Sequence, residues 1–166
     1  MKSNKMRGIK IMTLSAILLV GMSACNKTKS TSNKFIKAGE WTISELSVDG
    51  TNEDELPIWE IEDCDLYNES CFGEWKNDEG GHAEFIWQFR EKANTLEISH
   101  QIKEEEDDHD HEGEEHDHAA EEAAEQAYNF SGVYEVVKND KESMEFSSSS
   151  TAGFPGQAVV IKIEKK

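Results

Sequence analysis

The sequence predicts an all-β fold, a small antiparallel up-and-down barrel of seven or eight strands. Apolar and polar residues alternate with a period of two from Trp41 onward, turn-forming residues separate the alternating runs, and most connections are short. Antiparallel strands with one buried face either stack as a sandwich or close into a barrel. A simple meander closes most readily as a barrel because closure removes the exposed edges, and a β-sandwich is the alternative.

The first expected strand, residues 41–48, contains a change of phase. Its alternation runs through Ile43 and resumes one residue out of phase at Leu46. One extra residue in a strand of an antiparallel pair produces this pattern, so a β-bulge is expected between the two residues. The Asp49-Gly50 pair that follows is a strong signal for a two-residue hairpin turn.

The later strands are expected to be short alternating runs separated by turn residues. Phe85, Trp87 and Phe89 fall on one face of their run. Residues 91–94 are expected to form a hairpin loop, and glycine, asparagine and proline residues mark the other turns. The expected strands after the first are residues 58–61, 72–76, 85–89, 96–102, 130–137, 144–148 and 159–163.

Residues 103–128 form an insertion that does not fit the strand pattern. Between residues 104 and 126 the chain carries 13 acidic residues, four histidines and no lysine or arginine. Repulsion among like charges at this density disfavours compaction, so a loop is expected. Residues 119–127 within it are rich in alanine and glutamate, which predicts a short helix.

Two His-Asp-His repeats in this insertion predict affinity for a divalent transition metal. Residues two apart in an extended chain point to the same side, so each repeat presents two imidazoles to one ion. Neutral imidazole suits zinc, copper and nickel, and adjacent carboxylates orient the rings or complete the shell. The alternative is a solvated acidic insertion without a metal role. The candidate ligands are His109, His111, His116 and His118, with Asp110 and Asp117.

The N-terminal segment resembles the signal of a bacterial lipoprotein. Residues 1–24 combine a basic start, an apolar run over 11–20 and small residues directly before Cys25. The apolar run is shorter than the roughly 20 residues that span a bilayer. The resemblance implies cleavage before Cys25, acylation of its sulfur and its new amine, and anchoring in the outer membrane. In related lipoproteins acidic residues after the cysteine often accompany surface export, and Cys25-Asn26-Lys27 lacks them, so an anchor facing the periplasm is expected. Residues 25–37 lack apolar periodicity and are expected to be a flexible tether.

Composition narrows the class of protein. The chain carries 35 acidic and 17 basic residues, a formal net charge of −18. A surface of this sign repels nucleic acid, which excludes an electrostatically driven nucleic-acid role. The sequence contains no phosphate-binding glycine loop, no His-Glu-x-x-His and no Gly-x-Ser-x-Gly elbow. No enzymatic activity and no required cofactor are therefore expected.

Two cysteines remain besides Cys25, namely Cys64 and Cys71. In an oxidising compartment such a pair is expected to form a disulfide. Two free thiols and a metal-ligating pair are the alternatives.

Several short motifs resemble those of the lipocalin-like lipoproteins of Bacteroidetes-type bacteria. They are the opening Gly39-x-Trp41-x-Ile43, the Val48-Asp49-Gly50 turn, the aromatic strand 85–89 and Gly132-x-Tyr134. The resemblance covers residues 38–166 apart from the insertion. It implies a calycin-type barrel without known catalytic residues.

The interior of a small barrel is either filled by side chains or able to hold one small ligand. The residues expected to face it, and to line an apolar ligand, are Trp41, Phe85, Trp87, Phe89 and His100. The predicted function is a lipid-anchored, non-enzymatic binding protein of the cell envelope, whose ligand is a small apolar molecule, a divalent transition metal, or both. The alternative is an interaction lipoprotein of an envelope complex, with the acidic segment as a solvated contact arm.

Overall fold

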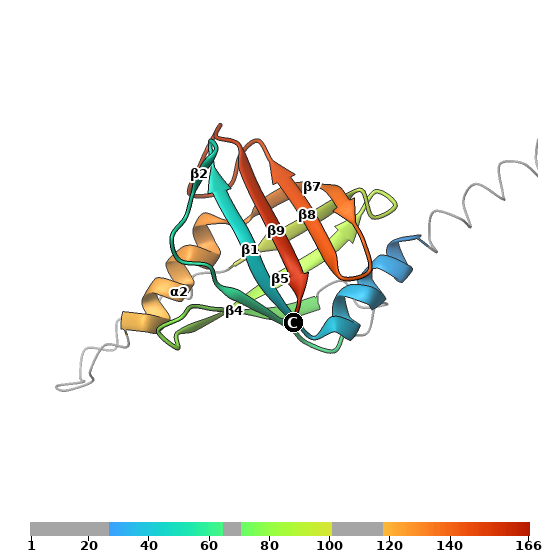
Figure 1. Cartoon of the computed structure of the whole chain (residues 1–166), viewed down its shortest axis with the longest axis horizontal. Helices are drawn as coiled ribbons and strands as arrows, with labels where there is room; N and C mark the ends of the chain where they lie inside the picture. The colour runs from blue at the N-terminus through green and yellow to red at the C-terminus, as the bar shows by residue number, and fades with distance from the viewer. Residues whose placement is uncertain (1–26, 65–70, 101–117) are drawn as a thin grey trace, which may run out of the picture.

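The computed structural model describes residues 27–64, 71–100 and 118–166 (Figure 1). These residues form a β-barrel with one helix at each end. The helices are residues 27–38 and α2, His118–Asn129. No helix in the described ranges is long and apolar enough to cross a membrane.

The nine strands of the described residues form a closed antiparallel meander. From β3 to β9, strands that are consecutive in the sequence pair with each other. The two-residue β2 pairs with β1, and β1 pairs next with β3. The barrel closes where β1 also pairs with β9. The predicted all-β barrel is therefore confirmed, with eight strands in the ring. The strands are β1 Glu40–Val48, β2 Thr51–Asn52, β3 Ile58–Ile61, β4 Cys71–Lys76, β5 His82–Arg90, β6 Thr95–Ser99, β7 Gly132–Asn139, β8 Ser143–Ser148 and β9 Val159–Lys165.

The bulge and the turn predicted in the first strand are both present. The register between β1 and β9 shifts between Ile43 and Glu45. This shift lets Ile43 and Leu46, which are three residues apart, both point into the barrel, where they are 1% and 2% exposed. Asp49 and Gly50 then adopt φ values of 48° and 78°, the left-handed backbone that a tight hairpin requires.

Large aromatic side chains fill the middle of the barrel. Trp59 lies among them, with ring centroids 5.8 Å from Trp75, 5.6 Å from Phe85 and 6.3 Å from Phe146. Alternation along each strand brings these residues inward. The largest fully buried side chains include Phe35, Trp41, Trp59, Trp75, Phe85, Trp87, Tyr134 and Phe146.

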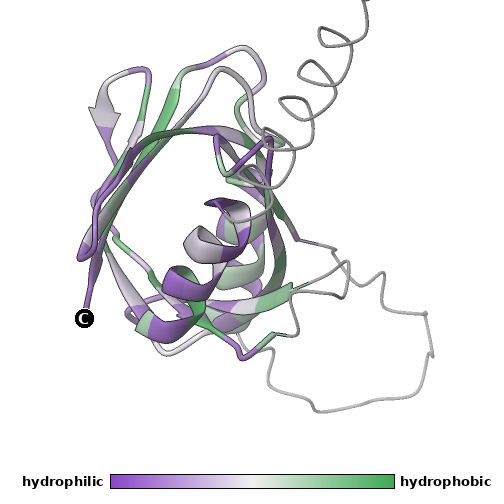
Figure 2. Ribbon diagram, turned by 90° about the vertical axis from the view of Figure 1, so that its right-hand side faces the viewer, coloured by the Kyte–Doolittle hydropathy of each residue, from purple (hydrophilic) through white to green (hydrophobic). Residues whose placement is uncertain are grey.

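Residues 27–38 are helical and cross one end of the barrel (Figure 2), which corrects the prediction of a flexible tether. Phe35 is fully buried, with ring centroids 5.7 Å from Trp41 and 4.9 Å from Trp87. Thr31 and Ser32, one turn earlier, are each only 5% exposed. The buried face of this helix therefore consists of one aromatic residue and small hydroxyl residues. Because only one residue of this face is apolar, the sequence shows no apolar residues repeating with the period of a helix.

The second helix, α2, covers the opposite end of the barrel and contains the helix predicted for residues 119–127. Ala123 and Ala127 are fully buried on the β4 and β5 side. The Trp75 indole donates a hydrogen bond to Gln126 at 3.1 Å. Phe130, directly after the helix, stacks on Trp75 with ring centroids 5.7 Å apart. These contacts attach the helix to the barrel.

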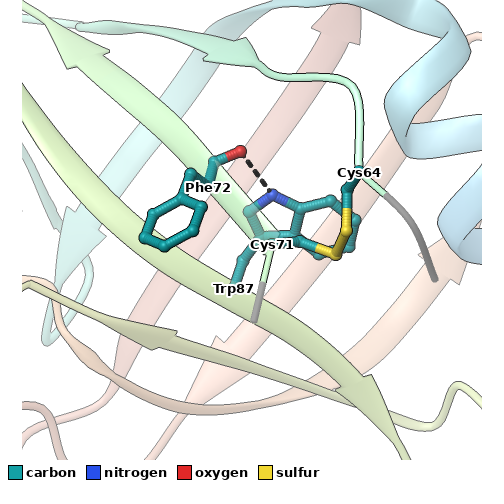
Figure 3. The surroundings of a disulfide bond; sticks show 4 residues. All are labelled: Cys64, Cys71, Phe72 and Trp87. Atoms are coloured by element: carbon teal, nitrogen blue, oxygen red, sulfur yellow. Dashed lines mark hydrogen bonds between the residues drawn. A yellow bond between two sulfur atoms is a disulfide. The ribbon is translucent and has the colours of Figure 1, made fainter. Parts of the chain in front are cut away.

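The disulfide between Cys64 and Cys71 is present, which confirms the predicted pairing (Figure 3). It joins the segment after β3 to the first residue of β4, with Cα atoms 5.4 Å apart. Beside it, the Trp87 indole donates a hydrogen bond to the carbonyl of Phe72 at 3.0 Å. The disulfide therefore holds the beginning of β4 to the segment after β3, and the hydrogen bond holds it to β5.

Tyr134 provides a test of the packing beneath α2. Its buried hydroxyl donates to the carbonyl of Phe130, and burial raises the pKa of the phenol above its usual value. Tyr134→Phe is expected to lower the free energy of unfolding by about 1 kcal/mol at pH 8, because the hydrogen bond is lost. The raised pKa gives stability that is present below about pH 10, the pKa of an unfolded tyrosine, and is lost above it.

The loss from Tyr134→Phe should therefore shrink as the pH rises beyond about 10. Urea unfolding at a series of pH values measures this difference. Tyr128→Phe is the control, since that side chain is 41% exposed. A difference between wild type and Tyr134→Phe that is the same at every pH would contradict the assigned burial.

Candidate functional site

Four of the predicted ligand-lining residues are core residues of the barrel. Trp41, Phe85, Trp87 and Phe89 are between 0% and 3% exposed. Phe35 packs against three of them, with ring centroids 5.7 Å from Trp41, 4.9 Å from Trp87 and 5.5 Å from Phe89. The sequence predicted an apolar ligand in this space. At this end of the barrel the side chain of Phe35, from the N-terminal helix, occupies it.

His100 lies beyond the end of β6 and is half-buried, so it does not sit in the middle of the barrel as its phase predicted. Its main-chain N–H donates to Ser131 Oγ at 2.8 Å, and its Nδ1 lies against the carbonyl of Glu84. Ser131 Oγ in turn donates to the carbonyl of Ala127 at 2.8 Å. His100 therefore connects the barrel wall to the end of α2, which is a structural role.

Of the predicted metal ligands, the structure describes His118. It is the first residue of α2, its side chain is 87% exposed, and its Nδ1 lies 3.5 Å from Glu121 Oε2. In the part of the chain that the structure describes, no group of three or more His, Cys, Asp or Glu residues is arranged to hold a metal ion. The other candidates, His109, His111, His116, Asp110 and Asp117, lie outside the described residues.

Carboxylates from three separate parts of the chain gather beside α2. Glu122, one helical turn after His118, shares a hydrogen bond with Glu55, and this contact is the largest cause of its raised pKa. The charges of Glu55, Glu79 and Asp78 raise the pKa further. The carboxylates around Glu122 therefore form a region of negative potential that a cation would relieve. The sequence did not predict this cluster, because its members come from the β2–β3 connection, the β4–β5 turn and the helix.

The position of α2 is fixed by polar contacts at its first turn. Asn77 Nδ2 donates to the carbonyl of Ala119 at 2.9 Å, and the Asn77 side chain also accepts a hydrogen bond from the N–H of Gly81 at 2.7 Å. His118, which directly precedes Ala119, is therefore at the end of the helix that is held beside the β4–β5 turn, the turn that carries Asp78 and Glu79. The acidic insertion joins the described fold at this point.

The fold defines the class of protein as a small closed antiparallel β-barrel with a helix over each end. Comparison of the chain with protein-family models, with curated proteins and with solved structures gives no match. Function is therefore inferred from the residues of this chain.

Proposed function

We propose that this protein is a lipid-anchored, non-enzymatic binding protein of the cell envelope that holds a divalent transition metal ion, namely zinc, copper or nickel. The proposed ligands are the imidazoles of His109, His111, His116 and His118, with Asp110 and Asp117 orienting them. The observation that carries the proposal is the position of His118. It lies at the start of a helix packed on the barrel, beside a cluster of carboxylates.

The surroundings of His118 favour a cation in two ways. Its imidazole is exposed and accompanied by Glu121 on the same helix, so a carboxylate is available to orient the ring. The carboxylates of Glu55 and Glu122 lie so close that the pKa of Glu122 is raised, and a bound cation would reduce their repulsion. The packed barrel serves as the scaffold, because its interior at the Phe35 end is occupied by aromatic side chains.

The proposed attachment to the membrane rests on Cys25 and on the small residues before it. An acylated Cys25 would tether the chain to the outer membrane on its periplasmic side, and two or more acyl chains make such anchoring stable. Binding, rather than catalysis, is the activity that the residues support.

Calorimetric titration of the full chain with zinc, copper and nickel salts at pH 7.4 tests the proposal. We expect micromolar or tighter binding of at least one metal, weakened at least about tenfold when His109, His111, His116 and His118 are all changed to alanine. Binding should also weaken below about pH 6.5, because protonated imidazole cannot coordinate a metal. His82→Ala is the matched control, since that histidine is exposed on β5 and lies outside the proposed site.

Two results would contradict metal binding as the function. One is an affinity weaker than about 100 µM for all three metals, which corresponds to no more than about 5.5 kcal/mol of binding free energy. The other is an affinity that the fourfold substitution leaves unchanged. Either result would leave the acidic segment as a contact arm for a protein partner, the alternative that the sequence suggests.

A further inference from the structure

Lysines line a groove at the end of the barrel opposite α2. The groove lies between the N-terminal helix, the β7–β8 turn and the end of β9, and its volume is about 600 Å³. The C-terminus and the N-terminal helix lie at this same end (Figure 1). Its charged residues are Lys29, Lys34, Lys37, Lys141, Lys165 and Glu142.

The groove has the opposite charge from the rest of the protein. Five ammonium groups face one carboxylate there, whereas the whole chain has a formal net charge of −18. Glu142 lies 3.9 Å from the Nζ of Lys141, so it compensates for one lysine at most. Of the neighbouring carboxylates, Glu40 pairs with Lys166, and Asp140 pairs with Lys138 while its charge also acts on Lys34. Lysines therefore outnumber carboxylates along the groove, and an anion would reduce the repulsion among them.

The walls of the groove are held together by polar contacts. Lys34 Nζ donates to Asn139 Oδ1 and to the carbonyl of Asp140, which joins the helix to the β7–β8 turn. Asn139 also donates to Thr31 Oγ1 at 3.1 Å. Since Phe35 anchors the same helix in the core, the lysines of the helix are held at fixed positions facing those of the turn and of β9.

The groove also lies next to the proposed lipid anchor. Cys25 precedes Lys27, the first residue of the described helix, by two positions, which a chain can span with at most about 7 Å. Electrostatic attraction between exposed charges extends over about 8 Å at physiological ionic strength. Anchoring at Cys25 therefore holds the helix that lines the groove beside the membrane surface. At the opposite end, the carboxylates of Glu55, Asp78 and Glu122 would be repelled by the same surface.

We propose that this lysine groove binds the phosphate groups of anionic phospholipids in the membrane that carries the Cys25 lipid. The barrel then stands on the bilayer by this end and directs α2, with His118 at its start, away from it. This inference rests on the lipid anchoring in the proposed function. Clusters of lysines beside a membrane attachment bind anionic lipid in this way, and the binding weakens as salt rises.

Lysine footprinting of the full chain, as the cell produces it, tests the groove directly. The protein is mixed with vesicles of phosphatidylcholine alone or with about 30% phosphatidylglycerol, and acetylation of each lysine by an amine-reactive reagent is followed by mass spectrometry. We expect Lys37, Lys141 and Lys165 to react at least about threefold more slowly on the anionic vesicles, and this protection to disappear in about 1 M NaCl. Lys76 and Lys162, on the barrel wall, should react equally on both kinds of vesicle.

A pair of matched variants checks that the positive charge of the groove is responsible. Lys37→Gln with Lys141→Gln removes two charges from the groove, and Lys76→Gln with Lys162→Gln removes two from elsewhere. Only the groove variant should abolish the protection of Lys165. Equal losses in the two variants would overturn the proposal, because they would indicate a general effect of net charge.

Flotation of the same samples separates this proposal from lipid anchoring. A lipidated chain floats with both vesicle types, and flotation with both but no selective protection overturns the groove proposal alone. A chain that fails to float with phosphatidylcholine vesicles refutes the proposed lipid anchoring at Cys25. If vesicles with phosphatidylglycerol then restore flotation, binding of anionic lipid by the groove is still supported. Protection by about 10 mM inorganic phosphate, with none by anionic vesicles, would overturn the membrane assignment in favour of a soluble anion.

Discussion

Replacing Phe35 by alanine is expected to lower the free energy of unfolding by about 3–5 kcal/mol, the range for removing a buried phenylalanine. The Phe35 side chain is fully buried. Its ring centroid lies between 4.9 and 6.3 Å from those of Trp41, Trp59, Trp87 and Phe89. Four aromatic rings would lose a packing partner at once, and the cavity would open at the end of the barrel. Equilibrium unfolding in urea, followed by tryptophan fluorescence, measures the loss.

The neighbouring Lys37 supplies the control for this substitution. It lies on the same helix but lines the exposed groove, so Lys37→Ala should change the free energy of unfolding by no more than about 0.5 kcal/mol. If Phe35→Ala cost no more than Lys37→Ala, residues 27–38 would not belong to the core. They would then be the flexible tether that their polar sequence suggests.

The second large effect is expected from Gly81→Ala, in the β4–β5 turn. A Cβ atom at this position would lie 1.8 Å from the carbonyl oxygen of Ala119 and 2.1 Å from its carbonyl carbon. Both atoms belong to the backbone of α2, so no side-chain rotation can relieve the overlap, and the first turn of the helix must move away. We expect a loss of about 2–3 kcal/mol in the free energy of unfolding, the upper part of the range for overpacking.

Hydrogen exchange locates this effect in the structure. The amides of α2 should exchange faster in Gly81→Ala, because displacement of Ala119 breaks its hydrogen bond with Asn77. Asp78→Ala, an exposed position in the same turn, should leave exchange in the helix unchanged. Unchanged exchange in Gly81→Ala as well would show that the helix is not held against this turn. The position of His118 beside the carboxylates would then lose its support.

The strands and their inward-facing residues were largely predictable because they depend on local patterns. A period of two identifies which side chains face inward, so residues 85–89 and 159–163 were recognised as strands with one buried face. The phase change after Ile43 indicated the bulge, since the extra residue must be accommodated for Leu46 to stay inside. The hairpin at Asp49-Gly50 followed from the ease with which these residues adopt positive φ.

The helix at residues 27–38 could not be predicted in the same way. Its buried face has a single large apolar residue, Phe35, and the small polar residues Thr31 and Ser32. Such a face gives no apolar period, and an isolated helix of this length is marginal in water. The open barrel end supplies the stabilisation by accepting Phe35 among its aromatic rings. Insertion of Phe35 also fills the space in which the sequence predicted an apolar ligand.

The sequence by itself determined the all-β barrel, the pairing of Cys64 with Cys71 and the helix within the acidic insertion, because each depends on residue types and on spacing along the chain. Only the tertiary structure decided which charges meet. Lys37, Lys141 and Lys165 share a groove, and Glu55 lies beside Glu122, although each set is far apart in the sequence. Closure of the barrel through β1 and β9 brings such residues to common ends. Electrostatic interactions depend on the distance between charges in space. In a meander these distances are fixed only when the first and last strands pair and the barrel closes.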